Sequence, residues 1–232
     1  MALVKFGGGI IEMRGAIAGT VFSRNKGGNY ARSKTTPINP NTGLQQSVRA
    51  VMASLTDRWS QVLTANQRTA WGLYAASVTV LNRLGESVNI SGFNHFIRSN
   101  ATLLRCGLTV VDDGPTTFEI PAQDPTLSIV CDEAGQEIEV TYDYAMGWNI
   151  IDDGHMFVYM GSPQNPQINF FAGPWRYADK VDGATAVPPA APAVMAAPFA
   201  MAEGQKIWCY ARIVMPDGRL SEKFRAETFC TA

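Results

Sequence analysis

The chain has 232 residues, of which 46% are hydrophobic and 17% charged, so it fits one large or two modest globular domains rather than a disordered protein. No stretch has the roughly 18 apolar residues of a membrane-spanning helix, and the start of the chain lacks the apolar run of a signal peptide. The net charge of −1 hides a division: residues 1–111 carry 12 lysines and arginines against three acids, a net +9, which leaves −10 for the remainder. This asymmetry suits head-to-tail contact between copies or a basic face on an acidic surface, and simple solvation of each half explains it equally well.

The first elements predicted along the chain are strands with a basic hairpin. The stretch "NKGG" at residues 25–28 is a hairpin turn, because Asn and Gly tolerate positive φ, and "NYARSK" is its return strand. Side chains alternate along a strand, so Tyr30, Arg32 and Lys34 of the return strand share one face. Arg24 and Lys26 lie near the same end of the hairpin. The prediction is a basic surface that contacts a partner through Arg24, Lys26, Tyr30, Arg32 and Lys34.

Three helices are predicted to follow the proline-broken segment "TPINPNT". Thr42 has Gln three residues later, the spacing of a capping box, and apolar residues then recur at helical intervals up to Val62. A second capping box from Thr64 to Gln67 begins another helix close behind. Ser91 caps the third helix, "GFNHFIRSNATLLRC", so residues 1–111 form a β-hairpin and helical domain.

Residues 112–118 are turn-rich and are predicted to be a linker. Beyond them, short alternating strands separated by turns predict a β-sandwich. The last predicted hairpin resembles the terminal strands of a fibronectin type III or other immunoglobulin-like domain, so the expectation is an immunoglobulin-like β-sandwich over residues 119–232, which makes the whole chain α+β. A long Pro/Ala-rich insertion, residues 161–205, separates the third and fourth predicted strands. A structureless connection of this length is usually functional or covered by a partner, so a partner is expected to cover its aromatic residues. These are Phe170, Phe171 and Trp175.

No catalytic, cofactor-binding or metal-binding motif accompanies these elements. The two histidines have no Ser/His/Asp pattern around them, the glycines at 7–9 lack the remainder of a phosphate-binding loop, and the two "DDG" turns lack the acids of a calcium loop. The four cysteines form no CxxC pair, which argues against zinc. We therefore expect a protein that is not an enzyme and uses no cofactor. The cysteines are expected to be reduced, although Cys131 and Cys209 could pair across a sandwich.

Several motifs in the first half resemble one known family. The segments "GTVFSRN", "NYAR", "PINPNT", "QRTAW" and "SGFNHFIRSN" are similar to those of uncharacterised proteins of tailed bacteriophages and prophages, over roughly residues 3–118. The resemblance implies a virion structural protein, and immunoglobulin-like domains are common additions to phage capsid and tail proteins. It supplies no catalytic residues. The expectation is a capsid-associated decoration protein, with a tail or baseplate component as the alternative, in several copies that contact other virion proteins.

Two rival functions remain open at this stage. A carbohydrate-binding module would stack sugars on Trp148, Trp175 and Tyr177. A non-specific nucleic-acid-binding protein would use the basic hairpin, with Phe22 and Tyr30 as stacking groups, although the second half of the chain is acidic. Binding to glycans would favour the first function, and salt-sensitive retention on DNA would favour the second.

Overall fold

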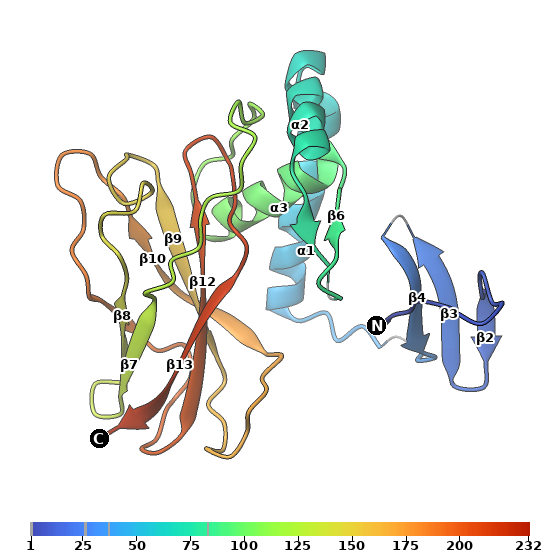
Figure 1. Ribbon diagram of the computed structural model, residues 1–232. Helices are drawn as coiled ribbons and strands as arrows, with labels where there is room; N and C mark the ends of the chain where they lie inside the picture. Colours follow the sequence, from blue (N-terminus) through green and yellow to red (C-terminus); the bar gives the residue numbers. More distant parts are fainter. Residues whose placement is uncertain (1, 26, 37, 83) are drawn as a thin grey trace. The chain divides into compact units, whose positions relative to one another are not determined.

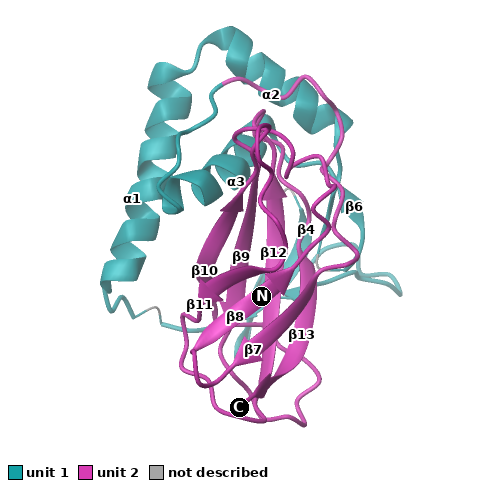
Figure 2. Cartoon of the chain, turned by 90° about the vertical axis from the view of Figure 1, so that its left-hand side faces the viewer, with its two compact units in different colours: residues 1–112 teal, residues 113–232 magenta. Residues whose placement is uncertain are grey.

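The computed structural model describes residues 2–25, 27–36, 38–82 and 84–232 of the chain. It divides into two compact units, residues 1–112 (unit 1) and 113–232 (unit 2), coloured separately in Figure 2. Unit 1 combines a small sheet with helices, and unit 2 is built on a larger, mostly antiparallel sheet (Figure 1). The chain is therefore α+β, as predicted.

A four-stranded antiparallel sheet begins unit 1, and we call residues 2–33 the arm. Its strand order is β1-β4-β3-β2. Residues 25 and 28 pair at the end of the hairpin, and Gly28 has a φ of 114°, which a side chain would disfavour. The strands are β1 (Ala2–Leu3), β2 (Gly15–Ile17), β3 (Thr20–Asn25) and β4 (Gly28–Ser33).

The helices of unit 1 begin at the predicted caps. The side chain of Thr42 accepts a hydrogen bond from the backbone of residue 45, Thr64 forms a complete capping box with Gln67, and the side chain of Ser91 accepts from the backbone of residue 94. The capping box expected at Thr42 is one-sided, because the buried side-chain oxygen of Gln45 has no partner among the described residues. The helices are α1 (Gly43–Asp57), α2 (Ala65–Ser77) and α3 (Gly92–Arg105).

Two further elements of unit 1 differ from the prediction. The first predicted helix ends as a π-helical turn, η1 (Arg58–Val62), and a short pair of strands, β5 (Val80–Leu81) and β6 (Ser87–Val88), joins α2 to α3. The helices bury an aromatic core in which the ring centroids of Trp71 and Phe96 lie 5.7 Å apart. A β-carbon on Gly92 would lie 2.8 Å from the backbone of α2, so only glycine permits this close approach.

Unit 2 contains a seven-stranded sheet of order β10-β9-β12-β13-β7-β8-β11. All pairs of neighbouring strands are antiparallel except β13 and β7, which are parallel. One hydrophobic core collects alternate residues from both halves of this sheet, for example Ile138 and Ile207, which is compatible with a β-sandwich. The strands are β7 (Ser128–Asp132), β8 (Glu137–Thr141), β9 (His155–Gly161), β10 (Trp175–Asp182), β11 (Ala193–Ala196), β12 (Lys206–Val214) and β13 (Phe224–Thr231).

The prediction that residues 161–205 form a structureless insertion is wrong for the interior of that segment. It contains two strands, and these pair with strands outside the insertion: β10 with β9 and β11 with β8. Alternation in β10 is interrupted by a register shift after Tyr177, and β11 is only four residues long between prolines, so neither strand has a clear periodic pattern. The four cysteines are free, so Cys131 and Cys209 do not pair.

Candidate interaction surfaces

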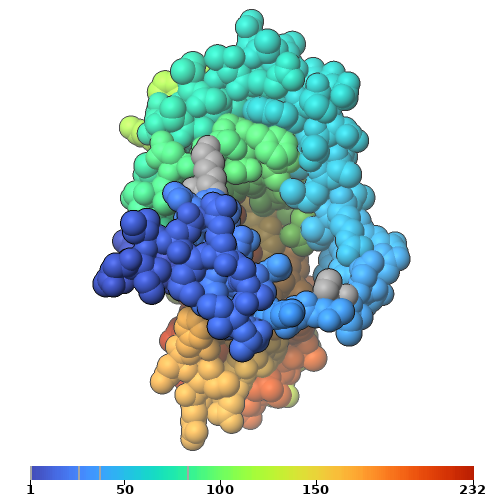
Figure 3. All heavy atoms as spheres, turned by 90° about the vertical axis from the view of Figure 1, so that its right-hand side faces the viewer, coloured from blue at the N-terminus to red at the C-terminus, as the bar shows by residue number. Residues whose placement is uncertain are grey.

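The arm has no hydrophobic core of its own. None of the described residues between 2 and 54 is buried, and the arm's strands contain only exposed or half-buried side chains (dark blue in Figure 3). Ile11 is 92% exposed and Ile17 60% exposed. A stable sheet normally buries at least one face against another layer. The arm therefore offers apolar and polar side chains on both faces to a neighbour.

The register of the hairpin separates the basic residues that the sequence predicted to gather on one side. Arg24 lies opposite Asn29, whereas Tyr30 lies opposite Ser23 and Arg32 opposite Val21. Directly opposed residues of an antiparallel pair project from the same face. Arg24 therefore lies on one face, and Tyr30 and Arg32 lie on the other, so the prediction of a single basic face is wrong.

Two basic residues of the prediction remain, Lys26 and Lys34, and only Lys34 can be placed. Lys26 falls outside the described residues. Lys34 follows β4 directly, is exposed, and its backbone N–H donates to the carbonyl of Gly19 at 2.8 Å. Arg24 lies 4.0 Å from the carboxylate of Glu12, which is too long to hold either side chain firmly at an exposed site. The arm is thus cationic along both faces rather than on one.

Within unit 2, Phe171 is covered by its own chain. Its side chain is 6% exposed, stacks on Trp208 at 5.4 Å between ring centroids, and meets Trp175 edge-on at 4.9 Å. Gly161 makes this possible, because a β-carbon there would lie 2.3 Å from the Phe171 ring. The expectation that a partner covers Phe171 is therefore wrong, since the ring already packs inside unit 2.

Trp175 and Phe170, the other two aromatic residues predicted to contact a partner, are placed differently. Trp175 begins β10 and is half-buried, with its indole N–H donating to the carbonyl of Ala172 at 3.2 Å and the guanidinium of Arg225 lying 5.4 Å from its ring. Phe170 is 78% exposed. Of the three aromatic residues predicted to contact a partner, Phe170 alone keeps its whole ring accessible.

The three residues predicted to stack on sugars do not form one platform. Trp148 is 2% exposed and packs against Tyr142 in the core of unit 2, with ring centroids 5.4 Å apart. It cannot offer a face to a carbohydrate ring, so its predicted role is wrong. Tyr177 is half-buried between Phe157 and Tyr159. The local sequence gives no sign of either packing, because Trp148 lies in a turn-rich stretch where exposure is the ordinary expectation.

A cluster of titratable side chains lies where β9 begins and β10 ends. The Nδ1 atom of His155 lies 2.6 Å from Asp182, which also pairs with Lys180. Burial alone would raise the pKa of Asp182, but the hydrogen bonds from Lys180 and His155 outweigh it and hold the pKa below its usual value. Among the described residues no three His, Cys, Asp or Glu side chains are grouped to hold a metal ion. Nor does any described helix have the length and hydrophobicity to span a membrane.

Comparison with known proteins finds remote structural similarity only. No protein-family model and no curated protein matches the chain. An Fn3-like protein from Clostridium thermocellum is 16% identical, with a TM-score of 0.30 over 49% of this chain and 97% of that one. A family 76 glycoside hydrolase from a bovine Bacteroides thetaiotaomicron strain is 15% identical, with a TM-score of 0.33 over 48% of this chain and 21% of that one. Neither similarity bears on what this chain does.

Proposed function

We propose that the chain is a non-enzymatic structural protein of a tailed-bacteriophage virion that acts through contacts with other virion proteins. The observation that carries this proposal is the arm, a four-stranded sheet in which no described side chain is buried. A sheet that buries neither face gains too little apolar burial to offset the entropy of ordering its backbone, which favours a neighbour that supplies the second layer. In a virion, neighbouring subunits provide such surfaces at high local concentration.

The resemblance of the first half of the chain to phage and prophage proteins supports the same function. A capsid-associated decoration or accessory protein is the first candidate, and a tail or baseplate component is the alternative. The chain would assemble onto particles in the host cytoplasm, in several copies. Its contacts would use both faces of the arm and the exposed ring of Phe170.

The fold proposed for unit 2 is an immunoglobulin-like sandwich of the fibronectin type III kind. The strand order supports it, because β7, β8 and β11 form one run of neighbours and β10, β9, β12 and β13 form the other. Residues of both runs enter one core.

The composition of purified particles tests the proposal. Virions of the phage or prophage that encodes the chain should contain it at a fixed number of copies per particle, by quantitative mass spectrometry of gradient-purified particles. Deletion of residues 1–33 should abolish incorporation, whereas Glu119→Lys, a change at an exposed site of unit 2, should not. Cryo-electron microscopy of the particles then distinguishes head from tail. Absence of the chain from intact virions would refute the proposal.

A further inference from the structure

The outer face of β7, β8 and β11 in unit 2 combines acidic and apolar side chains. In β8 the buried residues Ile138 and Val140 alternate with the exposed Glu137 and Glu139. The strand register places Glu139 directly between Val130 of β7 and Val194 of β11. These two valines are 50% and 54% exposed. A carboxylate flanked by two exposed valines forms a surface that an apolar and basic partner can cover.

One face of the arm has the complementary chemistry. Ile17 lies opposite Thr20, and Phe22 and Arg24 continue that face along β3, because alternate residues of a strand project from the same side. Ile17 is 60% exposed, Phe22 is half-buried and Arg24 is exposed. This face therefore presents an exposed isoleucine and a half-buried phenylalanine beside a cation.

The opposite net charges of the two units also favour contact between the arm of one copy and unit 2 of another. Unit 1 carries 12 lysines and arginines against four acids, a net +8, and unit 2 carries seven against 16, a net −9, which together give the −1 of the whole chain. Two arms, or two copies of unit 2, would repel each other, whereas an arm and a unit 2 attract.

We propose that the arm face with Ile17, Phe22 and Arg24 packs on the outer face of β7, β8 and β11 of a second copy of the chain, with Arg24 beside Glu139. The proposal deepens the proposed function, because it names the neighbour that supplies the second layer of the arm. The two surfaces in contact are different, so each copy keeps one free arm and one free sandwich face. Contacts of this kind continue from copy to copy and close into rings or extend into filaments.

The test measures self-association of the full-length chain by sedimentation velocity over a range of protein and salt concentrations. The native chain should form oligomers that dissociate as salt rises, because salt screens an interface between opposite charges. Arg24→Glu and Glu139→Lys should each weaken association by about tenfold or more, since each places like charges together. Both side chains are exposed, and circular dichroism would verify that each variant is folded.

Matched controls use residues of the same kind elsewhere on the same units. Arg32→Glu changes the opposite face of the arm, and Glu119→Lys changes an exposed acid outside the sandwich face, so each should alter association by no more than about twofold. The double variant Arg24→Glu/Glu139→Lys should regain association, because the exchanged charges again attract. An interface between two arms could not be rescued in this way.

Two outcomes would overturn the inference. One is a native chain that stays monomeric at low salt and high concentration. The other is an Arg32→Glu variant that loses association as strongly as Arg24→Glu. If the chain is nevertheless a fixed component of purified virions, the proposed function stands and the arm's neighbour there is a different protein. Absence from virions combined with self-association would instead refute the proposed function and leave the contact between copies intact.

Discussion

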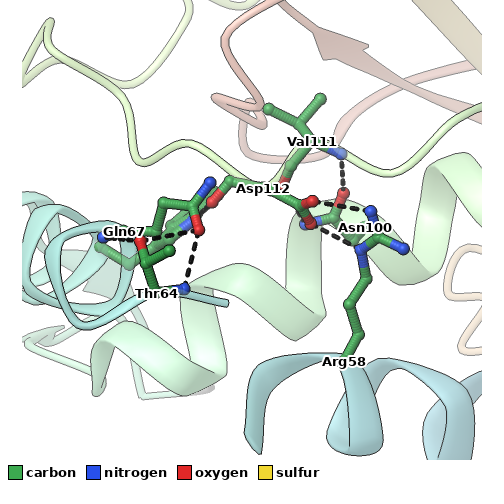
Figure 4. A network of polar contacts seen from close by, with 7 residues as sticks. Arg58, Thr64, Gln67, Asn100, Val111 and Asp112 are labelled. Carbon is green, nitrogen blue, oxygen red and sulfur yellow. Dashed lines mark hydrogen bonds and ion pairs between the residues drawn. The ribbon is translucent and has the colours of Figure 1, made fainter. Parts of the chain in front are cut away.

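The side chain of Asn100 binds both backbone groups of Val111, as a neighbouring strand would. Its oxygen accepts from the Val111 N–H at 2.7 Å, and its amide donates to the Val111 carbonyl at 3.0 Å (Figure 4). The next residue, Asp112, accepts two hydrogen bonds of 2.6 Å from Arg58 through its carboxylate, and its carbonyl accepts one from the indole of Trp71 at 2.9 Å. The end of unit 1 is thus fixed to η1, α2 and α3 by side chains rather than by secondary structure.

The first prediction concerns this fixation. Asn100 is fully buried and Val111 is partly buried, so Asn100→Ala leaves both backbone groups of Val111 without their partner and should lower the free energy of unfolding of unit 1 by about 1–3 kcal/mol. Asn94→Ala is the matched control, because Asn94 is an exposed residue of the same helix. Urea unfolding followed by tryptophan fluorescence measures both variants. Equal effects would mean that the Asn100 hydrogen bonds contribute little to stability.

Removal of the arm should leave the helices folded. Among the described residues, all the buried side chains of unit 1 lie from Leu55 onward, so deletion of residues 1–33 should leave the stability of the helical part nearly unchanged. Among the described residues the deletion breaks an exposed ion pair between Lys5 and Glu86, and exposed pairs of this kind contribute little to stability. Helical circular dichroism during thermal unfolding measures the effect. Collapse of the helical signal at a much lower temperature would show that the arm supports the helices.

Adjacent phenylalanines should respond in opposite ways to truncation. Phe171→Ala removes a ring buried between Trp175 and Trp208 and should destabilise unit 2 by about 3–4 kcal/mol. Phe170→Ala removes a ring that is 78% exposed and should change stability by less than about 0.5 kcal/mol. Chemical denaturation of the two variants side by side gives the comparison. A large loss of stability in Phe170→Ala would contradict the exposure of that ring.

Acidification should weaken unit 1 through one histidine. Burial, with a smaller contribution from Arg98, lowers the pKa of His95 to about 4 from its ordinary 6.5. Between pH 6.5 and 4 the unfolded chain binds a proton on His95 that the folded chain does not. The free energy of unfolding of unit 1 is therefore unaffected by His95 above pH 6.5 and falls by up to about 3 kcal/mol as the pH drops to 4. In unit 2 the pKa of Asp182 is depressed, so its contribution to the stability of that unit is lost only as the pH falls below the ordinary value of 3.8.

The variant His95→Phe isolates this effect. It keeps an aromatic ring against Tyr74, whose centroid lies 5.1 Å away, and should remove most of the decline in stability between pH 6.5 and 4. Urea unfolding at several pH values gives the slope for both proteins, and the NMR titration of His95 gives its pKa directly. A slope that persists unchanged in the variant would place the proton uptake on other groups.

Local signals in the sequence predicted much of the secondary structure. Thr64 and Gln67 form the complete capping box that their spacing indicated, and β8 lies in the region where short alternating strands were predicted. The hairpin turn before Gly28 was also predictable. Each of these features depends on residues within a few positions of one another, so it can be predicted from the local sequence without knowledge of the fold.

The sequence by itself therefore determined where the caps, the turn and the regularly alternating strands lie, and how the charge divides between the two units. Only the tertiary structure decided which face of the arm carries Arg24, that Phe171 packs against Gly161, and that Trp148 enters the core. It also decided that β10 and β11 pair with distant strands. The physical reason is that a side chain's exposure and a strand's partner are set by residues far away in the chain, and the pairing register fixes the face from which each side chain projects.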